Sequence, residues 1–102
     1  MIVHVDLAAA PPAVTLQDAE DLRAFKVLAT GGEDPAAVAS ALQGVGRMAP
    51  DGHAFIDPGA VRRMAGERDA PWRDSFAQML AYAGTKGWLD DQGAIQAHVE
   101  YE

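Results

Sequence analysis

The sequence predicts an α+β fold, a small and mainly antiparallel sheet with about four helices packed on one of its faces. Three observations predict this class. Alternating apolar and polar residues open and close the chain, a Pro-Asp-Gly turn lies near its middle, and helix start and stop signals fill the stretches between. We expect the sheet to consist of the two terminal strands and a central hairpin. A winged-helix-like fold is the alternative.

Length and charge narrow the class of protein. The 102 residues suit a single domain over 1–102, and 15 acidic against 8 basic residues give a net charge of -7. Because the basic residues form no stripe and no basic recognition helix, we expect no binding to nucleic acid or to an anionic membrane. The chain has no cysteine, which excludes thiolate catalysis and cysteine-held metal centres. No apolar run approaches the ~20 residues of a membrane span, so we expect a cytoplasmic protein.

The first third of the chain predicts one strand and one helix. Residues 2–7 alternate, and the connecting segment 8–14 contains Pro11-Pro12, which cannot continue a central strand. Thr15 then has the character of an N-cap, and Gly31-Gly32 would end the helix that it begins. Four apolar residues of this helix would face the core: Leu22, Phe25, Leu28 and Ala29.

The middle third predicts a helix, a hairpin and a second short helix. Asp34-Pro35 is a cap followed by a proline at the first helical position, which predicts a helix as far as Leu42. The segment Ala49-Pro50-Asp51-Gly52 fits a type I turn, with 53–56 as the second strand of the hairpin. Asp57-Pro58 repeats the cap signal and predicts a helix that Gly66 ends.

The last third contains the clearest helix, from Trp72 to about Lys86. Its apolar stripe is Trp72, Phe76, Met79, Leu80 and Ala83, which we interpret as core packing. A turn over 90–93 and a strand over 94–101 complete the chain. The turn lacks the acidic spacing of a calcium-binding loop.

The histidines offer the one candidate site. His4 precedes Asp6 by two residues, and His98 precedes Glu100 in the same way, so each pair would share one face of a strand. His53 opens the second strand of the hairpin. If these three strands are neighbours, all three histidines and both carboxylates lie on one surface. His4, His98 and Glu100 could then hold a divalent metal, or the cluster could act as a general base.

The simpler interpretation is a solvated polar face, or a polar dimer surface, because the exposed side of an antiparallel sheet is ordinarily rich in such residues. No specific catalytic motif is present, and exposed strand edges favour pairing with another chain. We therefore expect a small binding domain that acts through protein contacts, with itself as a homodimer or with a protein partner, and without a cofactor. The alternative is a small metal-binding protein or acid-base enzyme centred on the histidines and carboxylates.

Overall fold

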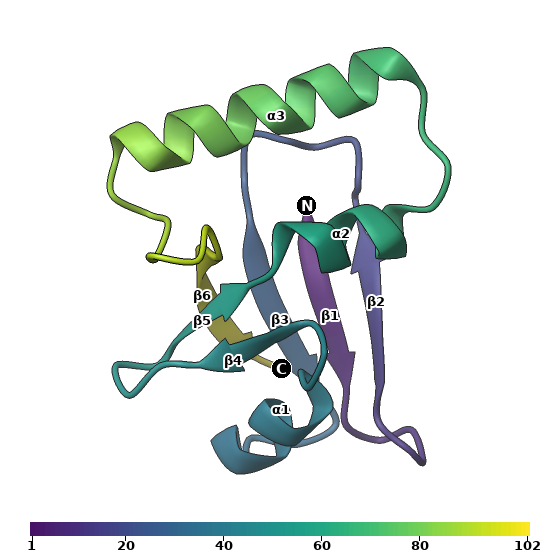
Figure 1. The fold of residues 1–102 in the computed structure, drawn as a ribbon. Helices are drawn as coiled ribbons and strands as arrows, with labels where there is room; N and C mark the ends of the chain where they lie inside the picture. The colour runs from purple at the N-terminus through teal and green to yellow at the C-terminus, as the bar shows by residue number, and fades with distance from the viewer.

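Six strands and three helices follow one another along residues 1–102, all of which the computed structural model describes (Figure 1). In chain order they are β1 (Ile2–Asp6), β2 (Ala13–Gln17), β3 (Lys26–Thr30), α1 (Pro35–Ala41), β4 (Gly46–Met48), β5 (His53–Ile56), α2 (Pro58–Ala65), α3 (Ala70–Thr85) and β6 (Ile95–Tyr101). The α+β class is therefore confirmed.

The strands form one curled, mixed sheet in the order β2-β1-β3-β6-β5-β4. Its centre is parallel, because β3 pairs with β1 on one side and with β6 on the other. The outer strands are antiparallel to their neighbours. The prediction of a mainly antiparallel sheet was thus wrong, as was the winged-helix alternative. The two terminal strands lie inside the sheet and are separated by β3.

The predicted helix between Thr15 and Gly31 does not form. Two strands, β2 and β3, take its place, and three helices are present where about four were expected. The helical interpretation left Val27 on the polar side of the helix, yet Val27 is fully buried beside Val3. Strand pairing on both sides of β1 satisfies that strand's backbone groups, which outweighs the helical spacing of the apolar residues.

The other three helices begin where the sequence predicts. The side chain of an aspartate caps the N-terminus of each helix. Asp34 accepts a hydrogen bond from the backbone N–H of Ala36 at 3.0 Å, and Asp57 accepts one from the backbone N–H of Gly59 at 3.2 Å. Asp69 accepts one from the backbone N–H of Trp72 at 3.2 Å. Proline follows in the first turn of all three, where its missing N–H costs nothing. No helix has both the length and the apolar character needed to cross a membrane.

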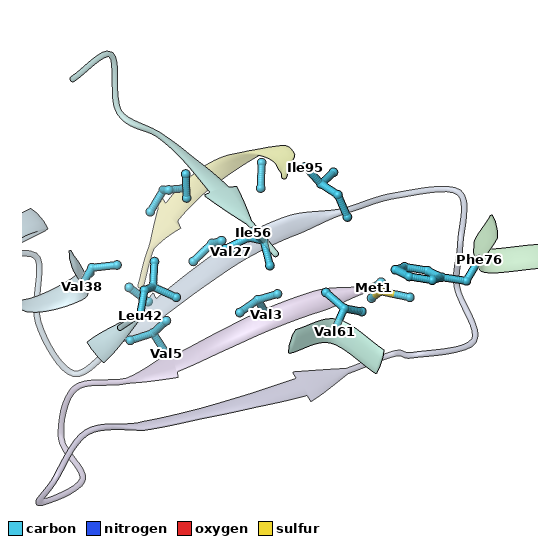
Figure 2. Packing of buried hydrophobic residues seen from close by; sticks show 14 of the residues in the cluster. Met1, Val3, Val5, Val27, Val38, Leu42, Ile56, Val61, Phe76 and Ile95 are labelled. Atoms are coloured by element: carbon cyan, nitrogen blue, oxygen red, sulfur yellow. The ribbon is translucent and has the colours of Figure 1, made fainter. Parts of the chain in front are cut away.

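One core connects the sheet to the helices (Figure 2). The strands supply small and branched side chains such as Val3, Val5 and Val27, and the helices close over them with Val61 and Phe76. Trp72 stacks on Phe76 with ring centroids 5.2 Å apart, and its indole N–H donates to the carbonyl of Ala19 at 2.7 Å. The aromatic packing predicted for this helix is thus confirmed, and the indole bond joins α3 to the segment that follows β2, at the end of the sheet (Figure 1).

Phe76 is the largest fully buried side chain, so its truncation leaves a cavity in the core. We expect Phe76→Ala to lower the free energy of unfolding by about 3–5 kcal/mol in urea denaturation. Gln78→Ala, on the exposed side of the same helix, should change it by less than about 0.5 kcal/mol. Equal effects of the two substitutions would contradict this packing.

Candidate functional site

The face of the sheet opposite the core carries the polar side chains of the strands. Across β3, β6 and β5, Lys26 lies opposite His98, and His98 lies opposite His53. His4 belongs to a different row, with Leu28 beside it on β3 and Glu100 beyond that on β6. Since β3 separates their strands, His4 and Glu100 are two strand spacings apart, roughly 10 Å. The structure brings two of the three histidines together and leaves His4 apart.

The two carboxylates of the predicted site, Asp6 and Glu100, each form a hydrogen bond with a nearby residue. Lys26 Nζ donates to Glu100 Oε2 at 2.9 Å, a contact that holds the pKa of Glu100 below its usual value and raises the pKa of Lys26. Asp6 accepts from the backbone N–H of Ala8 at 3.0 Å, where it stabilises the turn after β1. Neither carboxylate meets the paired histidines.

His4 is likewise tied to its surroundings. Its Nε2 lies 2.8 Å from Thr30 Oγ1, and its Nδ1 lies 3.3 Å from Gln17 Nε2. No three histidine, aspartate or glutamate side chains converge with the spacing of a metal centre. The geometry therefore offers no support for a metal held by His4, His98 and Glu100.

His53 and His98 form an edge-to-face pair with ring centroids 6.0 Å apart. Asp51 Oδ2 lies 3.2 Å from His53 Nδ1, close enough for an ion pair with a protonated ring, although the two are not aligned as a hydrogen bond. Asp51 Oδ1 accepts from the backbone N–H of His53 at 3.0 Å. This bond, and the ring beside it, hold the pKa of Asp51 below its usual value. Asp51 thus stabilises the turn before β5 and lies beside the Nδ1 edge of the His53 ring.

A cavity of about 590 Å³ opens beside this histidine pair. Its walls come from four places: the segment that enters β3, the start of β5, the C-terminal half of α3, and β6 together with the segment that connects α3 to it. The apolar lining residues are Leu22, Ala24, Phe25, Met79, Tyr82, Ala83, Trp88 and Ile95. The polar lining residues are Arg23, His53, Gln96 and His98.

The sequence drew attention to His53 and His98 but not to Trp88, Tyr82 or Asp51. The position of Trp88 in the sequence could have indicated an exposed aromatic residue. It directly follows Gly87 and belongs neither to the apolar stripe of the helix nor to the final strand. Met79 was assigned to the core, against which it packs partly buried, and it also lines the cavity. Tyr82 falls off the stripe, so its exposure follows from the helical period.

The two edges of the sheet differ in length and in charge. β4 has three residues, and its Arg47 forms an ion pair with Asp90 at 2.7 Å and lies over the ring of Phe55. Short length and charge are the usual protection of an edge strand. β2 has five residues and no charge, and its only backbone partner is β1. The outer edge of β2 is therefore open.

The chain matches no protein-family model, no curated protein and no solved structure.

Asp90 fixes the turn that brings Trp88 to the cavity. Its Oδ1 accepts from the backbone N–H groups of Ala94 at 2.8 Å and Gln92 at 2.9 Å. The Ala94 bond, followed by the contact with Arg47, lowers the pKa of Asp90. A carboxylate with a lowered pKa stabilises the folded state fully above its unfolded pKa of about 4, and this contribution is lost as the pH falls through the folded value.

We therefore expect Asp90→Asn to lower the melting temperature by a few degrees at pH 7, and the difference from wild type to narrow as the pH falls below about 4. Asp91→Asn removes the same charge from the neighbouring exposed position and should have little effect. Thermal unfolding followed by circular dichroism between neutral and acidic pH measures both. A difference that is independent of pH would contradict the role given to the Asp90 carboxylate.

Proposed function

We propose that this protein is a small cytoplasmic binding domain that acts through protein-protein contacts and pairs with a second copy of itself through β2. The observation that carries the proposal is the open, uncharged edge of that strand. The acidic balance of the chain supports a protein partner over nucleic acid, because phosphate binding needs clustered basic residues.

The backbone of β2 favours addition of a strand. Every second residue of an edge strand directs its N–H and C=O outward, and in β2 these groups form no backbone hydrogen bond with another part of the chain. None of the usual protecting devices, such as a lysine, a proline or very short length, lies within Ala13–Gln17. A strand of a second copy would satisfy these groups.

The side chains of β2 support the same pairing. Val14 and Leu16 face the core but are only partly buried, because no strand lies beyond them. An antiparallel pair centred on Thr15 would place Val14 beside Leu16 of the partner subunit, and Thr15 beside its own counterpart. Both apolar residues would then gain cover, and the two-fold symmetry is that of the commonest class of homodimer.

The net charge of each copy determines how the dimerisation depends on salt concentration. Each copy carries a net charge of -7, and Asp18 directly follows β2. Like charges on two approaching copies repel, and salt screens that repulsion over about 10 Å at 0.1 M ionic strength. We therefore expect the dimer to become more stable as salt is added from a low starting concentration.

The test is light scattering coupled to size-exclusion chromatography over a range of protein concentrations. We expect a mass of twice the 10.8 kDa of the chain. Thr15→Lys should raise the dissociation constant at least tenfold, because two lysines would face each other across the new pair, and a lysine is a common guard of edge strands. Gln78→Lys, which makes the same charge change on the exposed side of α3, is the matched control.

A strictly monomeric wild type at high concentration and moderate salt would refute the homodimer. So would a Thr15→Lys variant that dimerises as well as Gln78→Lys, because the interface would then lie elsewhere. Circular dichroism of both variants separates loss of pairing from loss of fold.

A further inference from the structure

The cavity beside His53 and His98 lies away from β2 in the order of the strands. Its size lies within the roughly 300–1,000 Å³ of small-molecule sites. Tyr82 and Trp88, which are 55% and 45% exposed, are the only large apolar side chains that the fold leaves exposed. Both line this cavity, and they contact each other edge to face with centroids 5.8 Å apart. Exposed apolar surface gathered in one place marks a binding site more often than scattered residues do.

The polar groups of the cavity are all able to donate hydrogen bonds. Arg23, His53, Gln96 and His98 line it, and no aspartate or glutamate does. Of these four, Arg23 lies 3.7 Å from Asp21 and His53 lies 3.2 Å from Asp51, and both aspartates are outside the lining. His98 and Gln96 point to the same side of β6, two residues apart, and His53 lies across from His98. Such a set of donors beside apolar walls is complementary to an anion attached to an apolar group.

The rim of the cavity is held in place by the backbone. Trp88 donates its backbone N–H to the carbonyl of Ala83 at 2.9 Å and accepts at its own carbonyl from the N–H of Gln96 at 2.7 Å. The end of α3 and the start of β6 therefore both fix this residue. A preformed wall reduces the ordering cost of binding.

We propose that this cavity binds a small carboxylate with an aromatic or similarly flat apolar body. The body lies between Trp88, Phe25 and Met79, and the carboxylate accepts hydrogen bonds from His98 and Gln96, with Arg23 at the rim. This site is independent of pairing at β2, so either can be absent without the other.

The test compares three probes that share a phenyl ring and a two-carbon side chain but differ in charge: phenylacetate, phenethyl alcohol and phenethylamine. Each is titrated into the protein while the backbone amides are followed by two-dimensional NMR. We expect phenylacetate to shift the amides of Phe25, Trp88 and Gln96, and to bind about tenfold more tightly than the alcohol, the effect of one charge-assisted hydrogen bond. The amine should bind most weakly.

Variants assign the contacts. His98→Gln should weaken phenylacetate binding about tenfold and leave the alcohol unchanged, because only the anion forms a charge-assisted hydrogen bond with the N–H of the ring. Trp88→Ala should weaken both, because it removes a wall of the cavity. His4→Gln lies on the same face of the sheet but outside the cavity, and should change neither.

Three results would overturn the proposal: no amide shifts with any probe, equal binding of all three probes, or equal loss of phenylacetate binding in the His4→Gln and His98→Gln variants. The unshifted amides of each variant report whether it remains folded, so a loss of binding in a folded His98→Gln protein supports the site.

Discussion

Insertion of β3 between β1 and β6 is the constraint on which the rest of the structure depends. A strand in the centre of a sheet must have its backbone groups satisfied on both sides, and β1 obtains this from β2 and β3. The parallel pairs on either side of β3 require long connections, and α1, α2 and α3 all lie in the connection from β3 to β6. These helices bury the apolar side of the sheet and leave the row of Lys26, His98 and His53 on the other.

The same strand order determines where binding can occur. With β1 and β6 inside, the chain's free backbone edges are those of β2 and β4, and only β2 is long and uncharged. Trp88, in the connection from α3 to β6, lines the cavity together with residues of the segment that enters β3. The open strand edge and the cavity, on which the two proposals rest, thus belong to one topology.

Much of the local structure could be predicted from the sequence, because helix caps and the burial of one helix face depend on residues that are close together in the chain. Asp34, Asp57 and Asp69 cap helices through their own neighbours, and the period of Trp72 and Phe76 shows which side of α3 is buried. The strand order could not be predicted, because it depends on which distant segments pair. The apolar residues of the segment before Gly31 fit the spacing of a helix and the spacing of a strand equally well. Only the need of β1 for a hydrogen-bonded strand on its second side decides between the two structures. For the same reason the sequence could suggest that histidines gather on one face, but not that His53 would join His98 while His4 stayed apart.

Amide hydrogen exchange measured at several protein concentrations tests the strand order and the open edge together. Amides of β1, β3, β6 and β5 should be the most protected at every concentration, because these strands are paired on both sides. The outward amides of β2 should exchange rapidly in dilute solution and slow as the concentration rises, while those of β4 remain unchanged. Rapid exchange along β1, or slowing at β4 in place of β2, would contradict the arrangement of the sheet and the pairing built on it.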